Sequence, residues 1–206
     1  MTYPAITISS ATKLPHGLLR DLFTFRHAVF VDRLGWVPPR GDEEVDFFDA
    51  LNPVYVLCQD GDGAILATAR LLPMTGPSML RDVFPTLLGD TPCPNDTGTW
   101  EISRFALRPA TGTRTSHRHI LLTMTERLFR FAQHRGIRRL VAVSDTRLEH
   151  MVAQATGLPL HRLAPPQRLG NGWAMAGWAE VSEAACALLA ARSRTGQPSG
   201  SRRAAA

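Results

Sequence analysis

The chain has 206 residues, of which 44% are hydrophobic and 20% are charged, a composition typical of a globular protein with one core. No apolar run approaches the roughly 18 residues that a membrane-spanning helix needs. The N-terminus, MTYPAITISSATK, lacks the basic start and apolar run of a secretion signal. We therefore expect a protein of the cytoplasm with no membrane partner.

The formal net charge of +5 comes mostly from the end of the chain. Residues 190–206 (AARSRTGQPSGSRRAAA) hold four arginines and no acidic residue, and the rest holds 19 basic against 18 acidic residues. A composition of this kind is typical of disorder. We predict one folded domain over residues 1–190 and a basic tail over residues 191–206. The charge gives little support to a nucleic-acid partner.

The sequence shows no pattern that would hold a metal. Cys58, Cys93 and Cys186 stand far apart, without the paired spacing of a disulfide framework or a zinc site. The closest histidines, His117 and His119, have no acidic residue or cysteine near them at a ligand-like spacing. We therefore predict no metal site.

The first half of the chain predicts a helix, a long loop and a hairpin. Apolar residues recur at helical spacing over residues 16–34, and the polar stretch VPPRGDEEVDFFDALNP follows as a loop. The runs VYVLCQ (54–59) and AILATARLLP (64–73) flank an Asp-Gly-Asp-Gly turn and predict a hairpin. TWEISRFAL (99–107) predicts another strand.

The second half predicts alternating helices and strands. We expect helices over 114–135 and 147–156, each followed by a glycine, and a last helix that begins at Ser182. We expect strands over 138–144, 158–163 and 173–181. This order favours an α/β (α+β) domain with a mixed central sheet flanked by helices.

Charged residues inside apolar elements point to a site, because burying an unpaired charge is costly. Arg26 lies in the first helix, Arg70 in the hairpin, and Asp46 and Asp49 in the loop. In a regular strand, Glu101, Ser103 and Phe105 would share one face and Trp100 and Arg104 the other. Glu101 and Arg104 serve one site only if the strand is bulged or lies at a split in the sheet.

These residues fall in an order that resembles a known family. The pattern Arg26-x3-Phe30-x5-Trp36, Glu44-x-Asp46-x2-Asp49, Arg70, Phe84 and Glu101-x2-Arg104 is similar to the LuxI-type acyl-homoserine-lactone synthases. The segments ARLLPMTGPSMLRDVFP, WEISRFA and PPQRLGNGW are also similar to that family, and the resemblance covers roughly residues 5–185.

The resemblance implies a fold and a reaction. It implies an N-acetyltransferase-like fold with a cleft where neighbouring central strands splay apart. The α-amine of S-adenosylmethionine would attack an acyl thioester, and the methionine carboxylate would then displace methylthioadenosine and close a lactone. Because the sulfonium is already a good leaving group, no cofactor is expected.

The resemblance also implies roles for the matching residues. Glu101 is the expected general base, with Asp46 and Arg104 as its catalytic partners. The expected substrate-binding residues are Arg26, Phe30, Trp36, Asp49, Arg70, Ser103 and Phe105. Asp46 and Asp49 suit the positive groups of S-adenosylmethionine, and Arg26, Arg70 or Arg104 suits its carboxylate or braces those acids. The rings of Phe30, Trp36 and Phe105 suit the adenosyl-sulfonium part.

The acyl chain needs an apolar tunnel, and the donor needs a docking surface. We expect the acyl pocket among Phe84, Trp100, Met124, Leu128, Val143 and Ser144, although ordinary core packing explains them equally well. A hydroxyl at Ser144 would favour a polar group on the acyl chain. Arginines crowd the stretch from Arg114 to Arg139. This stretch is either a solvated helix face or the docking site of an acidic acyl carrier protein.

Two other functions fit parts of the sequence. A general N-acetyltransferase would use acetyl-CoA, but the expected R/Q-x-x-G-x-G/A loop is replaced by RPATGTRTS at residues 108–116. A nucleic-acid-binding module would explain the high pI of about 9.8 but not the carboxylates of Asp46, Asp49 and Glu101. The acyl donor, carrier protein or CoA, is left open by the sequence.

Overall fold

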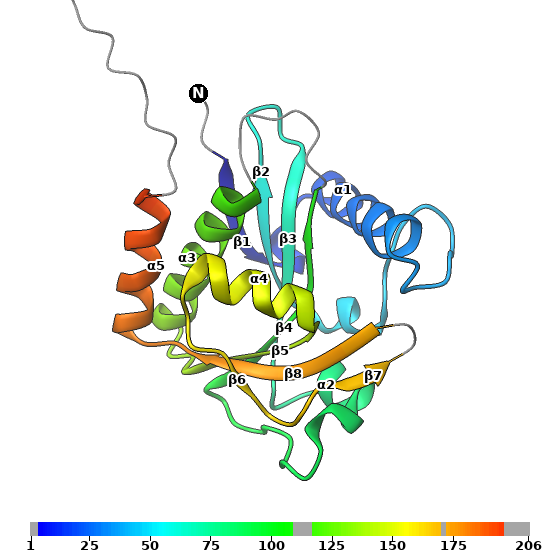
Figure 1. The fold of residues 1–206 in the computed structure, drawn as a ribbon. Coiled ribbons are helices and arrows are strands. Elements are labelled where there is room, and N and C mark those ends of the chain that lie inside the picture. Colours follow the sequence, from blue (N-terminus) through cyan, green and yellow to red (C-terminus); the bar gives the residue numbers. More distant parts are fainter. Residues whose placement is uncertain (1–3, 109–116, 170–171, 196–206) are drawn as a thin grey trace, which may run out of the picture.

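Eight strands form one mixed sheet in the computed structural model, which describes residues 4–108, 117–169 and 172–195 (Figure 1). Along the sheet lie β1 (Ala5–Ser10), β2 (Val54–Gln59), β3 (Ile65–Pro73), β4 (Thr99–Leu107), β5 (Arg139–Asp145), β8 (Gly172–Glu180) and β6 (His161–Arg162), with β7 (Gln167–Leu169) also paired to β8. Every neighbouring pair is antiparallel except β4 and β5.

The sheet splits where β4 and β5 meet. Their pairing runs from Thr99 opposite Arg139 to Ile102 opposite Ala142, although β4 continues to Leu107 and β5 to Asp145. In Figure 1, β4 follows β3 upward while β5 follows β8 across the lower half of the molecule. The split therefore opens toward the carboxyl ends of both strands.

Helices cover both faces of the sheet because successive side chains of a strand point to opposite faces, and both faces carry apolar side chains. On one face, α3 (His117–His134) and α5 (Glu183–Thr195) bury the main core against β2 and β3, and α4 (Thr146–Thr156) packs beside them. On the other face, α1 (His16–His27) and its π-helical continuation η2 (Ala28–Arg33) cover β2 and β3. The short helices α2 (Met79–Asp82) and η4 (Pro85–Leu88) cover β5 and β8 on that second face.

The predicted fold class is confirmed, but several elements differ from the sequence prediction. The strand β1 and the short helices α2 and η4 were not predicted; β1 is an edge strand in which Ile6 and Ile8 alone pack against the main core. The predicted strand over 158–163 is wrong except at His161–Arg162, because Pro159 offers no backbone donor and Leu158 packs into the core after α4.

The predicted domain limit at residue 190 falls inside a helix. The helix α5 continues to Thr195, and Arg192 donates hydrogen bonds to the carbonyl oxygens of Gln154 and Ala155 at the end of α4. The first residues of the predicted helix over 114–135, and the tail beyond residue 195, lie outside the described residues. Within the described part of the chain, no helix is long and apolar enough to cross a membrane.

We predict that Gly157→Ala lowers the free energy of unfolding by about 1 kcal/mol or more. Gly157 ends α4 with a φ of 68°, and an added Cβ would lie 2.6 Å from the guanidinium of Arg192. Gly17→Ala is the matched control, because Gly17 lies in α1 with no atom within 4 Å of an added Cβ. Urea denaturation of both variants tests this; an equal change in both would contradict it.

Candidate active site

Three arginines and three carboxylates meet on the sheet face that α1 covers. They come from α1, from the loop before η3 (Phe47–Leu51), from η3 itself, and from the neighbouring strands β3 and β4. The residues of this charge cluster are Arg26, Glu44, Asp46, Asp49, Arg70 and Arg104. Their formal charges cancel, so the cluster is neutral as a whole.

Arg26 connects α1 to the acidic loop. Its Nε lies 2.6 Å from Glu44 Oε2, and its two terminal nitrogens bond both oxygens of Asp49 at 2.8 and 2.9 Å. The backbone N–H of Glu44 also donates to the carbonyl of Phe23 in α1. The Arg26 side chain is only 1% exposed, so these acidic partners are what make its burial possible.

Arg70 connects β3 to the same loop. Its Nη1 lies 2.5 Å from Asp46 Oδ1 and 2.8 Å from Asp49 Oδ1, and its Nε donates to Ser103 Oγ at 3.0 Å. Ser103 stands opposite Arg70 in the register of β3 and β4. The Arg70 side chain is fully buried, and its ion pairs with Asp46 and Asp49 hold the acidic loop against β3.

Arg104 reaches the cluster because β4 is bulged. Opposite Thr68–Arg70 in β3, β4 places Ser103–Ala106, one residue more, and Arg104 has a φ of 50°. A non-glycine residue adopts this conformation at a cost on the order of 1 kcal/mol. The bulge turns Arg104 to the side of Ser103, where its Nη2 lies 2.8 Å from both Glu44 Oε1 and Asp46 Oδ2.

The acidic loop owes its shape to its own carboxylates. Asp46 caps η3 by accepting the N–H of Phe48, and Asp49 accepts the N–H of Asp46 in return, a reciprocal capping box. Tyr55 of β2 donates its hydroxyl to Asp49 at 2.6 Å. Each aspartate is therefore held by backbone donors as well as by arginines.

Burial opposes ionisation of these acids, but the arginines outweigh it. For Asp49, hydrogen bonds and charge from Arg26, and then the charge of Arg70, hold the pKa far below its usual range. For Glu44, burial is likewise overcome by Arg104 and Arg26, which lower its pKa. Asp46 is the most accessible acid, with 20% of its side chain exposed against 2% for Glu44 and 3% for Asp49.

Glu101 lies next to the charge cluster and is held differently. Its two oxygens accept the N–H groups of Met79 and Leu80, at 2.9 and 2.7 Å, in the first turn of α2. Ser78 caps that turn by accepting the N–H of Arg81. Burial raises the pKa of Glu101, and these backbone hydrogen bonds together with Arg70 only partly oppose the rise. A buried carboxylate with a raised pKa is a candidate for proton transfer.

Met79 joins Glu101 to the cluster. Its sulfur lies 3.2 Å from Arg104 Nη1 and 3.5 Å from Arg70 Nη2, while its N–H donates to Glu101. The bulge of β4 therefore brings Arg104 to the same face of the sheet as Glu101, and Met79 contacts both residues.

The predicted aromatic residues divide between two faces. The Phe30 ring lies 5.4 Å from the Arg104 guanidinium carbon and 6.1 Å from the Trp36 ring, and Trp36 is 57% exposed. The bulge turns Phe105 away from Glu101 and Ser103, and it packs against the main core on the other face. The regular-strand pattern, which placed Phe105 beside Glu101, is therefore wrong at this residue.

The predicted acyl-pocket residues also divide. Trp100, Met124 and Leu128 belong to the main core under α3, whereas Phe84 and Val143 pack against the cluster around α2 and η4. Ser144 lies on β5 beyond the paired segment, with its hydroxyl 3.5 Å from the sulfur of Met175. The predicted acyl-pocket residues therefore lie on both faces of the sheet.

The arginines of the predicted basic stretch are spread along α3 and beyond its end. Arg118 begins α3, whereas Arg138 and Arg139 stand at the closed end of the split, and Arg114 lies outside the described residues. The helix α3, which carries Arg118, Arg127 and Arg130, has 18 residues and is about 27 Å long. Arg130 pairs with Glu126, so only part of this charge is free for a partner.

Sequence reasoning gave no role to Tyr55 and Met79. A tyrosine in a buried strand and a methionine beside a turn are usual core residues, so neither residue type indicated a place in the site. Glu44 stood in the recognised pattern without a role, and the structure places it between Arg26 and Arg104.

The fold identifies a broad structural class first. A mixed sheet split between two parallel strands is the fold of N-acetyltransferases, and a solved Lactobacillus plantarum protein assigned to that class matches with a TM-score of 0.56 at 14% identity, covering 86% of this chain and 99% of its own. At this identity the likeness concerns the fold alone.

The family follows from closer relatives. The family model for autoinducer synthases matches residues 10–189. An acyl-homoserine-lactone synthase from Ralstonia nicotianae is 35% identical over 187 residues, which is 88% of this chain and 91% of the relative. The chain therefore belongs to the autoinducer synthase family, as its motifs predicted, and it is an acyl-homoserine-lactone synthase.

Solved structures agree with this assignment. The synthase LasI matches with a TM-score of 0.85 and 30% identity, over 92% of this chain and 95% of its own. BjaI, a CoA-dependent synthase solved with SAM and isopentyl-CoA, matches with a TM-score of 0.83 and 28% identity, over 95% and 91%. Membership of this family sets aside the general N-acetyltransferase and the nucleic-acid-binding module.

We predict that acid removes stability that the charge cluster supplies. The pKa values of Asp49 and Glu44 are lowered by folding, so their contribution is complete above their ordinary values of 3.8 and 4.5 and is lost as the pH falls through the folded values. Asp49→Asn should cost about 3 kcal/mol at pH 7 and flatten the decline below pH 4.5. Urea denaturation between pH 7 and 3 measures both; an unchanged slope in the variant would contradict this.

Proposed function

We propose that the chain forms an N-acyl-homoserine lactone from S-adenosylmethionine and an acyl thioester carried on a phosphopantetheine arm. The observation that carries this is the neutral charge cluster beside Glu101, which opens to solvent at Asp46 and Arg104. The α-amine nitrogen of S-adenosylmethionine forms an amide bond with the carbonyl carbon of the thioester, and the thiol of the phosphopantetheine arm leaves. The methionine carboxylate then attacks its own γ-carbon, and the sulfonium leaves as methylthioadenosine. No metal or redox cofactor enters this proposal.

The charge cluster suits the charged end of S-adenosylmethionine. Asp49 and Glu44 are buried and already bonded to arginines, so they brace the cluster instead of reaching the substrate. Asp46 is 20% and Arg104 is 12% exposed, and they present a carboxylate and a guanidinium side by side. We assign the ammonium or sulfonium to Asp46 and the substrate carboxylate to Arg104.

Glu101 is the proposed general base. The amine, whose pKa in water is ordinarily near ~8, must lose a proton before it attacks. A raised pKa makes Glu101 a better base than a free glutamate, although both its oxygens already accept a backbone N–H. The remaining lone pairs would take the proton directly or through a water molecule.

Phe30 and Trp36 suit the adenosyl-sulfonium part. Their rings lie side by side next to Arg104, and the exposed Trp36 has room to cover a ligand. Phe105 faces the main core, so we assign it instead to the acyl side of the split. With Trp100, Met124, Leu128 and Ser144 it would line the acyl chain, and Phe84 and Val143 would border the opposite wall.

The split suits the donor. Beyond Ile102 the edge of β4 that faces β5 pairs with no strand of the described residues, so its backbone groups are available to the two amides of a pantetheine arm. Because this arm occurs in both acyl carrier proteins and CoA, it does not decide between them. We propose a carrier protein that docks near Arg118, at the open end of the split; BjaI shows that a CoA donor occurs among relatives. We retain the predicted cytoplasmic location within this proposal.

Mass spectrometry tests the proposed reaction. Purified protein is incubated with S-adenosylmethionine and matched acyl-carrier-protein and acyl-CoA thioesters of several chain lengths. We expect an acyl-homoserine lactone and methylthioadenosine in equal amounts, with the preferred donor identified by its rate. Acylation of another amine, or no product from any donor, would contradict the proposal.

We predict that Glu101→Gln lowers kcat by about 100-fold or more, because the amide cannot accept the proton of the amine. Glu43→Gln is the control: Glu43 is a partly exposed acid next to the cluster, 3.8 Å from Arg20. Glu43→Gln should keep the wild-type melting temperature, and Glu101→Gln should stay folded with a lower one, because its amide NH2 group meets one of the two backbone N–H donors. A folded Glu101→Gln enzyme with near wild-type turnover would rule out the base role.

A further inference from the structure

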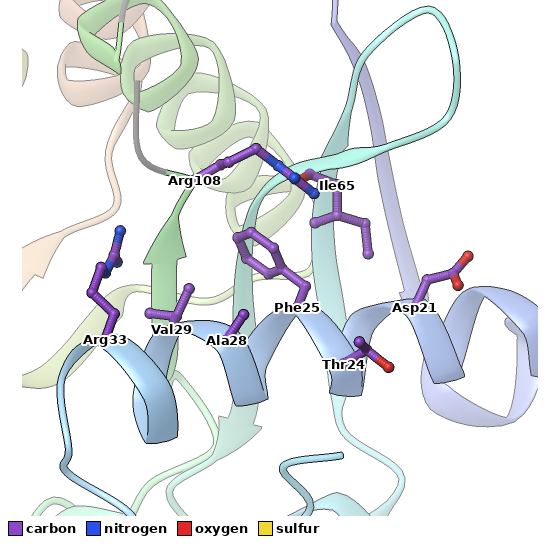
Figure 2. A pocket seen from close by; sticks show the side chains of 8 residues that line it. All are labelled: Asp21, Thr24, Phe25, Ala28, Val29, Arg33, Ile65 and Arg108. Carbon is purple, nitrogen blue, oxygen red and sulfur yellow. The ribbon is translucent and has the colours of Figure 1, made fainter. Parts of the chain in front are cut away.

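Several arginines outside the charge cluster donate to backbone carbonyls. Arg108 donates its Nε to the carbonyl of Ile65 at 2.7 Å, on the border of a pocket of about 390 Å³ that lies against α1 (Figure 2). Arg192 joins α5 to the end of α4 in the same way. Arg81 of α2 differs from both, because its guanidinium reaches three carbonyls that belong to two separate segments of the chain.

Arg81 joins α2 to the chain that leaves β3 and to the chain that enters β4. Its Nη2 lies 2.7 Å from the carbonyl oxygen of Met74 and 3.0 Å from that of Pro94, and its Nη1 donates to the carbonyl of Gly76. Met74 and Gly76 follow β3, whereas Pro94 precedes β4. The guanidinium therefore fixes α2 relative to the two strands that carry the candidate active site.

The helix α2 is a single turn, which is too short to be stable by itself. Its cap bonds, from the N–H of Arg81 to Ser78 and from the N–H of Ser78 to Asp82, join residues of the same turn and do not attach it to the sheet. Leu80 is fully buried and packs against β5 and β8, but apolar packing has no preferred direction. The hydrogen bonds of the Arg81 side chain are directional, so they set the orientation of the turn.

Glu101 depends on this orientation. Its two oxygens accept the N–H groups of Met79 and Leu80, which lie in the same turn as Arg81. Hydrogen bonds to the ionised form of a carboxyl group lower its pKa, and here they act against the burial that raises the pKa of Glu101. A turn released from the carbonyls would move its N–H groups away from Glu101, and the carboxylate would then bind a proton at a higher pH.

We propose that Arg81 is a positioning residue for Glu101: it holds α2 so that two backbone N–H groups stay on the carboxylate and keep it ionised during the reaction. The inference rests on the proposed function, because that function makes Glu101 the general base. Two charged groups act on Glu101, Arg70 from β3 and Asp82 from α2, and the variants below leave both in place. On β5, the residue opposite Glu101 is the apolar Val141.

An NMR titration tests the positioning without turnover. The amide signals of Met79 and Leu80 should move as Glu101 gains its proton, and the midpoint of this movement is measured in the wild type, in Arg81→Lys and in Arg81→Gln. Arg81→Lys keeps the positive charge but has one donor nitrogen in place of the planar fork. We expect the midpoint to rise by about one pH unit in Arg81→Lys and by at least as much in Arg81→Gln. A shift in Arg81→Gln alone would indicate an effect of charge and would overturn the proposal.

The pH dependence of kcat tests the consequence for the reaction. The substrate amine titrates alike in both enzymes, so the ratio of kcat in Arg81→Lys to kcat in the wild type reports Glu101. This ratio should be about one tenth below both midpoints and should return to nearly one above both. Arg192→Lys is the matched control, because it also breaks bonds from an arginine to carbonyls, at the end of α4. It should leave the midpoint and kcat unchanged, even with a lower melting temperature.

The two measurements separate a failure of this inference from a failure of the proposed function. A raised midpoint in Arg81→Lys, together with a kcat ratio that is the same at every pH, would support the positioning of Glu101 and contradict its role as general base. A midpoint that does not move in Arg81→Lys would overturn the inference, whatever the variant does to turnover.

Discussion

The site depends on the burial of Arg26 and Arg70 beneath the acidic loop. A buried guanidinium is tolerated only when carboxylates neutralise it, and a buried carboxylate only when donors surround it. Asp49 satisfies both arginines at once and also ties down the start of η3 and the hydroxyl of Tyr55. This single carboxylate therefore fixes α1, β2, β3 and the loop relative to one another, and leaves Asp46 and Arg104 at the surface of an otherwise closed cluster.

The backbone of β4 is as important as the charges. Without its bulge, Arg104 would point into the main core and Phe105 would stand beside Glu101. With the bulge, one strand contributes Glu101, Ser103 and Arg104 to the polar face and Trp100, Ile102 and Phe105 to the apolar face. Because β4 also borders the split, the proposed sites for the charged substrate and for the acyl chain lie on the two faces of one strand.

The sequence predicted the family, the fold class, the hairpin and the long helices, because these depend on local periodicity and on motif order. It placed Arg26, Asp46, Asp49, Arg70, Glu101 and Arg104 in one site, which the structure brings together, although their catalytic roles stay predictions. The sequence could not predict the hydrogen-bond partners of Glu101. These partners are the backbone N–H groups of Met79 and Leu80, and almost every residue type has such a group. The sequence predicted the wrong face of the sheet for Phe105. The cause is the positive φ of Arg104, which no neighbouring residue type indicates.

The most direct test of the prearranged charge cluster compares two ligands. S-adenosylmethionine carries the ammonium, carboxylate and sulfonium that Asp46 and Arg104 are proposed to bind, whereas methylthioadenosine carries none of them. Calorimetric titration of the wild type and of Asp46→Asn with each ligand measures this difference. We predict that the variant binds S-adenosylmethionine at least about tenfold more weakly, while its affinity for methylthioadenosine is nearly unchanged. Equal losses for both ligands would contradict recognition of the charged end by the cluster.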